Sequence, residues 1–120
     1  MTWLRIPLHP MTAEISWLHL PEFTEAELLV RAELTSDEAE RLAAFPEAAV
    51  QRRKEWLAAR VLVRERAAEL GLPSGRILYE PSGRPYWDGG DGMGRRPISI
   101  SHTTDWAALM MAQATVRRCG

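Results

Sequence analysis

The chain has 120 residues, of which 46% are hydrophobic and 26% are charged. This size and composition suit one globular domain, residues 1–120, with a core of its own, and they exclude a disordered segment. The net charge of −1 gives no indication of nucleic-acid binding, and no apolar run is long enough to span a membrane. A single cysteine excludes an internal disulfide and favours the reducing cytoplasm.

The charges are sorted along the chain although they nearly cancel. Residues 22–47 are rich in acids, whereas residues 52–66 are rich in arginine. A second basic pair, Arg95 and Arg96, precedes the last apolar stretch. Such sorting fits an anionic ligand or partner, although a solvated helix face is its more frequent cause.

The first third of the chain contains signals for one strand and two helices. Residues 13–20 alternate apolar and polar side chains, which predicts a strand ended by Pro21. Thr24 is followed by acids, as is typical of a helix N-cap. Ser36 repeats that signal and predicts a second helix, closed by Pro46.

The longest helical stretch covers residues 48–70 and is stopped by Gly71. At 100° per residue, its arginines at positions 53, 60 and 64 fall within roughly 40° of one another. They lie in an otherwise apolar arc. In one interpretation their stems cover apolar surface and their heads pair with acids such as Glu38 or Glu40. In the other they form an anion site that faces a cleft.

The last third of the chain reads as strands joined by turns. Residues 76–81 form a short strand, and Ile98, Ile100 and residues 106–114 form a closing hairpin. The glycine-rich residues 89–94 lack the strand–loop–helix setting of a phosphate-binding loop, so they receive no nucleotide role. Helices and antiparallel strands alternate without a βαβ rhythm. The predicted fold class is therefore α+β, a small antiparallel sheet packed against helices.

The bend of the closing hairpin gathers polar, proton-active residues beside the most apolar run: Ser101, His102, Thr103, Thr104 and Asp105. Turn residues commonly bond locally, so one interpretation pairs His102 with Asp105. The other gives His102 a ligand.

The order of four segments resembles the N-terminal half of 4'-phosphopantetheinyl transferases of the surfactin-synthetase-activating type. The segments are LTSDEAERLAAF, RRKEWLAARVLVR, SGRPYW and ISISHTTDWAALMMA. The resemblance covers residues 34–120 and, more loosely, the first strand. It implies one half of a pseudo-dimer of two α+β halves with coenzyme A in the cleft between them. It also implies transfer of the phosphopantetheine arm of coenzyme A to a serine of an acyl or peptidyl carrier protein.

The resemblance implies a set of coenzyme A-binding residues: Arg53, Arg60, Gly83, Arg84, Pro85, Ser101 and His102. Arg84 follows a glycine turn and precedes a rigid proline, which suits a charge-assisted fork to a phosphate. Arg52 and Lys54 stand behind Arg53. Relatives often carry more basic residues on the preceding helix, where this chain has only Arg41.

The family's acidic Gly-x-Asp-x-Glu motif would begin at Gly120, where this sequence ends. Its Trp-x-x-x-Lys-Glu segment does not occur either. The resemblance therefore implies no catalytic and no metal-binding residue in this chain, and Mg²⁺ is expected only in a full-length protein. The chain alone is expected to be inactive, as the N-terminal part of a longer enzyme.

Two further expectations concern partners. The surface that the second half would cover is expected to be apolar and to favour a homodimer. The alternatives to a transferase half are a non-catalytic module that binds coenzyme A or a carrier protein, and a structural α+β domain whose arginines are all paired.

Overall fold

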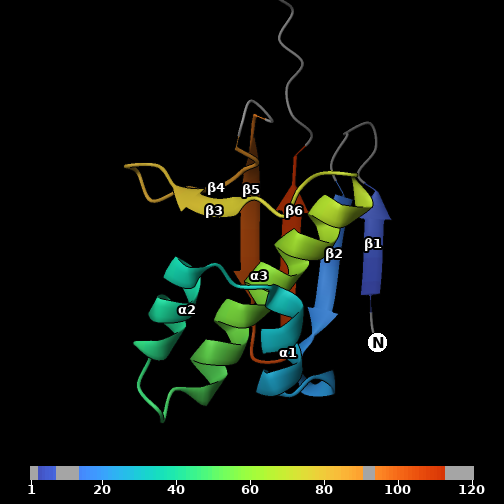
Figure 1. The fold of residues 1–120 in the computed structure, drawn as a ribbon. Coiled ribbons are helices and arrows are strands. Elements are labelled where there is room, and N and C mark those ends of the chain that lie inside the picture. The colour runs from blue at the N-terminus through green and yellow to red at the C-terminus, as the bar shows by residue number, and fades with distance from the viewer. Residues whose placement is uncertain (1–2, 8–13, 91–93, 113–120) are drawn as a thin grey trace, which may run out of the picture.

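The computed structural model describes residues 3–7, 14–90 and 94–112. Helices cover one face of an antiparallel sheet, which confirms the predicted α+β class (Figure 1). The helices are α1 (Glu25–Ala32), α2 (Ser36–Ala43) and α3 (Val50–Glu69), with a short 3₁₀ turn at Leu20–Glu22. The strands are β1 (Trp3–Pro7), β2 (Glu14–His19), β3 (Arg76–Tyr79), β4 (Pro85–Asp88), β5 (Arg95–His102) and β6 (Trp106–Met111).

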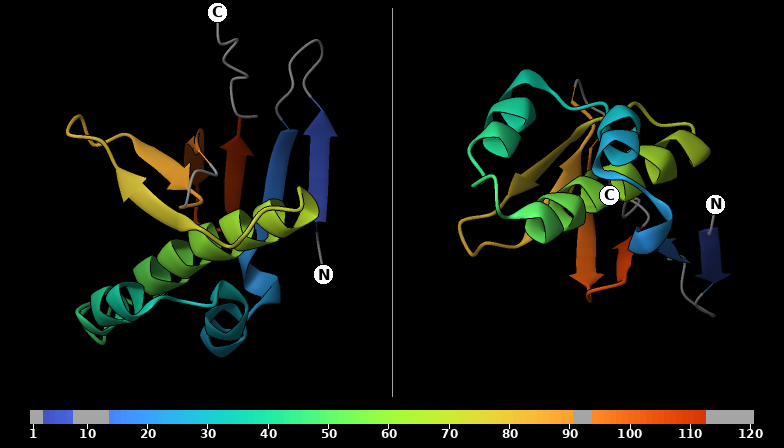
Figure 2. Two further views of the ribbon diagram at one scale, coloured as in Figure 1. Left: turned by 45° about the horizontal axis from the view of Figure 1, so that its top comes forward. Right: turned by 90° about the horizontal axis from the view of Figure 1, so that it is seen from below.

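The sheet has six strands in the order β1-β2-β6-β5-β4-β3, and every neighbouring pair is antiparallel. The N-terminal hairpin β1–β2 therefore pairs with β6, the last strand in the sequence. Strand β1 forms one edge of the sheet and β3 forms the other. Figure 2 shows α3 running across the strands on the helical face. No helix in the described parts of the chain has the length and apolarity to cross a membrane.

The core lies between α3 and the sheet. Leu57 and Leu62 of α3 are fully buried against Leu18 of β2 and Leu109 of β6, which are 0% and 1% exposed. Strand β4 contributes Trp87, also fully buried. Because α3 buries side chains on the sheet side and against α1, most of its length is fixed in place.

Both short helices begin with a capping box. The Thr24 hydroxyl accepts a hydrogen bond from the Glu27 backbone N–H at 3.1 Å, and the Glu27 carboxylate accepts one from the Thr24 N–H at 2.8 Å. The N-cap expected at Thr24 is thus confirmed. The N-cap expected at Ser36 is wrong. Thr35 caps α2, because the capping box spaces the hydroxyl three residues before its acid, Glu38.

Candidate functional site

A cavity of about 470 Å³ opens between α3 and the ends of three strands, and we call it the α3 cavity. Its walls combine cations, aromatic rings and one carboxylate. It is lined by Phe45, Arg52, Glu55, Trp56, Ala59, Arg60, Tyr79, Pro85, Ile100 and His102. Three of the residues predicted from the sequence, Arg60, Pro85 and His102, therefore meet here.

Arg60 forms the floor of the α3 cavity. Its side chain is 3% exposed, and its guanidinium carbon lies 4.0 Å from the Trp56 ring centroid. The same group approaches the Tyr79 hydroxyl at 3.5 Å and a Glu38 carboxylate oxygen at 3.7 Å. Its Nε has no hydrogen-bond partner within the described residues. Arg60 is thus a buried, ring-stacked cation that retains donor capacity.

Glu38 is shared by two buried arginines. Its carboxylate accepts a hydrogen bond from Arg64 Nη2 at 2.6 Å and lies 3.7 Å from Arg60 Nε. Burial lowers the pKa of the Arg64 guanidinium below its ordinary value, and the Glu38 charge opposes that shift. The Glu33 charge acts on Arg64 in the same direction as that of Glu38. The interpretation that arginine heads pair with acids therefore holds for all three arginines, because Arg60 and Arg64 face Glu38 and Arg53 faces Glu25.

Arg53, one of the predicted coenzyme A-binding residues, lies in a different environment from Arg60. Its Nε lies 3.0 Å from the Glu25 carboxylate, and its Nη1 donates to the backbone carbonyls of Pro46 and Glu47 at 2.7 and 3.0 Å. These contacts tie α1 and the α2–α3 loop to α3. Arg53 does not line the α3 cavity, whereas the adjacent Arg52 does. The structure therefore separates Arg53 from Arg60, Pro85 and His102.

His102 lies at the end of β5, where it contacts α3. Its Nδ1 lies 3.4 Å from Glu55 Oε1. Gln51 Nε2 donates to Glu55 Oε2 and to the Thr104 carbonyl, both at 2.9 Å. The acid that faces His102 is therefore Glu55 rather than Asp105, which was the partner in the local-turn interpretation. Glu55 and Gln51 had not been singled out in the sequence, although their i, i+4 spacing on one helix places them together.

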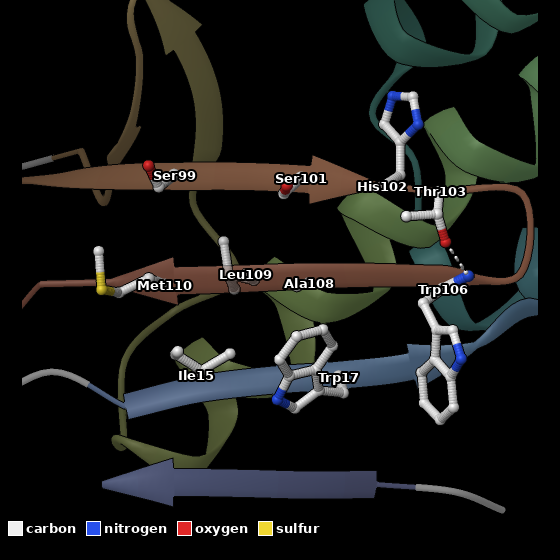
Figure 3. A pocket seen from close by; sticks show the side chains of 10 residues that line it. All are labelled: Ile15, Trp17, Ser99, Ser101, His102, Thr103, Trp106, Ala108, Leu109 and Met110. Atoms are coloured by element: carbon white, nitrogen blue, oxygen red, sulfur yellow. Dashed lines mark hydrogen bonds between the residues drawn. The ribbon is translucent and has the colours of Figure 1, made fainter. Parts of the chain in front are cut away.

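Ser101 faces the opposite side of the sheet from the core. Ser101 and Trp17 are both paired with Ala108 in the register, so all three share the face away from the helices. Figure 3 shows this face and a cavity of about 250 Å³, which we call the open-face cavity. It is lined by Ile15, Trp17, Ser99, Ser101, His102, Thr103, Trp106, Ala108, Leu109 and Met110. His102 lines both cavities, so it marks the rim between them.

Arg84 adjoins the α3 cavity through its neighbour Pro85. Gly83 adopts a φ of 91° in the turn before β4, a conformation that glycine accepts without strain. The Arg84 side chain is exposed and lines a separate cavity of about 380 Å³. Pro85 and Ile100 line that cavity and the α3 cavity alike. Arg84 and His102 are therefore connected along one surface.

The α3 cavity brings cations and aromatic rings together, with Arg52, Arg60, Trp56 and Tyr79 among its lining residues. In the described part of the chain, no group of three or more His, Cys, Asp or Glu side chains is placed to hold a metal ion. Buried and exposed cations surround aromatic faces, an arrangement that suits a phosphorylated ligand with a ring. Tyr79 and Phe45 complete the aromatic wall and were not predicted, because they come from β3 and the α2–α3 loop.

Fold and site together define an α+β domain with a cationic, ring-lined cavity. A family model described as the 4'-phosphopantetheinyl transferase N-terminal domain matches residues 38–112. The match covers more than half of the chain, so the chain belongs to the 4'-phosphopantetheinyl transferase superfamily and corresponds to its N-terminal part. No curated protein matches the chain.

Proposed function

We propose that the chain binds coenzyme A in the α3 cavity. In this proposal it supplies that half-site for transfer of the 4'-phosphopantetheine arm to a serine of an acyl or peptidyl carrier protein. Family membership supports a phosphopantetheinyl transferase-related role. The observation that carries the choice of ligand is the meeting of Arg52, Arg60 and His102 in one cavity, where Arg60 lies over the Trp56 ring and Arg52 over the Phe45 ring. Coenzyme A combines phosphates with a purine ring and so matches both kinds of wall.

The Arg60 guanidinium on the cavity floor supports this ligand. It stacks on Trp56 and lies 3.7 Å from Glu38, beyond hydrogen-bond distance, so it retains the capacity to bind an anion. Arg84 would meet the same ligand from the neighbouring cavity, over the Pro85 ring. Ser101 would reach it only at the end of β5, where His102 lines both faces.

We propose that the chain alone does not perform the transfer. Phosphoryl transfer depends on positioning and on neutralisation of the developing charge, and the described residues offer no carboxylate cluster that fits Mg²⁺. The same observation favours the alternative function, a non-catalytic module that binds coenzyme A or a carrier protein. Both functions use the α3 cavity as a binding site. The proposed setting remains the cytoplasm.

Calorimetric titration of the 120-residue chain with coenzyme A tests the binding step. We expect saturable heat and a rise in melting temperature with coenzyme A, and neither with pantetheine, which lacks the phosphates. An absence of heat and of thermal shift would leave a structural domain as the remaining interpretation. Incubation with an apo carrier protein, coenzyme A and Mg²⁺ separates a transferase from a binding module.

The expected homodimer has a defined surface in this proposal. The open-face cavity gathers half-buried apolar side chains, Ile15, Trp17, Trp106 and Met110, and no acidic, lysine or arginine side chain lines it. We propose that a second copy of the chain covers this face, because an uncharged apolar patch favours a like surface.

A further inference from the structure

We propose that Glu55 is a positioning residue that holds a proton on His102 Nδ1 and fixes the ring, so that the charged imidazole donates from Nε2 to a phosphate. The inference deepens the proposed function and rests on the α3 cavity as a coenzyme A site. It concerns a carboxylate within a cavity that otherwise presents cations. A carboxylate there repels an anionic ligand, so its presence in the cavity needs a separate explanation.

The contacts form a chain from the hairpin bend to the cavity. The Thr104 carbonyl accepts from Gln51 Nε2, and the same amide nitrogen donates to Glu55 Oε2. The second oxygen, Glu55 Oε1, faces His102 Nδ1 at 3.4 Å. The Glu55 side chain is 17% exposed, whereas that of His102 is 50% exposed. Each oxygen of the carboxylate thus faces one polar side chain, Gln51 or His102, and half of the His102 side chain stays exposed.

The direction of each hydrogen bond follows from the donors available. The amide nitrogen of Gln51 can only donate, so Glu55 Oε2 is the acceptor there. A carboxylate facing Nδ1 favours a proton on that nitrogen, because the tautomer of a histidine is set by the partner of its other nitrogen. In the charged form both ring nitrogens carry protons, and Nε2–H then donates to a phosphate while Nδ1–H remains on Glu55.

The groups that face His102 are consistent with this role. In the α3 cavity they are Glu55, Arg52, Arg60 and the Tyr79 hydroxyl, and no titratable side chain other than His102 lines the open-face cavity. Glu55 is therefore the one acid among the lining residues that offsets the two guanidinium groups.

Nitrogen-15 NMR of the histidine rings in the 120-residue chain tests the positioning directly, without a ligand. At a pH where the imidazole is neutral, we expect the Nδ1–H tautomer for His102, assigned by its loss in His102→Gln. Glu55→Met keeps the side-chain length but removes the acceptor, and should convert His102 to Nε2–H. Glu55→Gln keeps an acceptor oxygen and should restore Nδ1–H. Glu69→Met removes the same charge at the far end of α3 and should change nothing.

Coenzyme A titration of the same variants supplies the second measurement. Glu55→Met should weaken coenzyme A binding about tenfold, the scale of one charge-assisted hydrogen bond, while Glu69→Met should not. An Nε2–H tautomer in the unsubstituted chain, unchanged affinity in Glu55→Met, or tighter binding would each overturn the inference. If the unsubstituted chain binds no coenzyme A, the proposed function fails, and the NMR spectra still decide whether Glu55 sets the tautomer.

Discussion

The guanidinium carbon of Arg60 lies 4.0 Å from the ring centroid of Trp56, four residues earlier on α3. Because i, i+4 neighbours on a helix face the same way, the backbone fixes this stack. Arg60→Lys keeps the charge but loses the planar donor fork. We expect coenzyme A binding to weaken by about 1–3 kcal/mol, measured by calorimetry. Arg31→Lys on α1 is the matched control, and equal effects in both variants would contradict the assignment.

Arg84 directly precedes β4 and His102 ends β5, so the two side chains would reach the proposed ligand from separate segments. Arg84→Ala and His102→Ala should each weaken coenzyme A binding by about 1–3 kcal/mol, the scale of charge-assisted hydrogen bonds. Titration calorimetry at fixed ionic strength measures the loss, with Arg31→Ala as the control for the removal of one positive charge. Full affinity in both variants would remove these residues from the site.

Glu38 is expected to contribute more to stability than a residue that only caps a helix, because it also contacts two buried arginines. Glu38→Gln preserves the length of the side chain but leaves Arg60 and Arg64 without their shared carboxylate. Removal of one partner of a buried ion pair costs about 3–5 kcal/mol, so urea unfolding should show a loss on that scale. Glu27→Gln changes the same capping-box position of α1, which has no buried arginines, and it should lower stability much less than Glu38→Gln does. Similar losses in both variants would refute a special role for the buried pair.

The Glu27 carboxylate should make stability depend on pH in acid. Its hydrogen bond from the Thr24 backbone N–H, followed by that from the Thr24 hydroxyl, lowers the pKa of Glu27 below its ordinary value. A lowered folded-state pKa means that the contribution is present above the ordinary glutamate pKa, about 4.3, and is lost as pH falls through the folded value. Compared with Glu27→Gln, the unsubstituted chain should be the more stable at neutral pH. Urea unfolding should find this difference gone in strong acid, and an advantage that persists there would contradict the account.

The homodimer proposed for the open face predicts concentration-dependent sedimentation. Trp17→Lys places a charge in the centre of that face and should shift the chain to a monomer without loss of helical content. Val30→Lys, at a side chain that is 77% exposed on α1, is the control and should leave association unchanged. A monodisperse monomer at high concentration in the unsubstituted chain would end the proposal.

Local patterns in the sequence predicted much of the fold. The strand predicted at residues 13–20 is found at Glu14–His19, and the long helix predicted at residues 48–70 is found at Val50–Glu69. Both carry a clear periodicity bounded by proline or glycine. Strand β1 was not foreseen, and the N-cap of α2 was misplaced by one residue, because adjacent Thr35 and Ser36 carry the same local signal.

The residues of the site were harder to predict from the sequence, because the site depends on packing between elements. The helical projection placed Arg53 beside Arg60, but Arg53 forms an ion pair with Glu25 on α1. A projection of α3 alone contains no information about contacts with another helix. The strand alternation that separates Ser101 from His102 follows from the period of two along β5. The role of Glu55 required the position of His102, which is distant in sequence.

Helix α3 spans 20 residues, about 30 Å at 1.5 Å per residue, and supplies Arg52, Glu55, Trp56 and Arg60 to one wall of the α3 cavity. These four side chains therefore move together with the helix, while the opposite wall belongs to the sheet. The Gln51 hydrogen bond to the Thr104 carbonyl couples the two walls where the hairpin bends. A ligand that draws the helix toward the strands would consequently displace the β5–β6 turn as well, and exchange of the Trp106 backbone amide, which bonds the Thr103 hydroxyl, would report it.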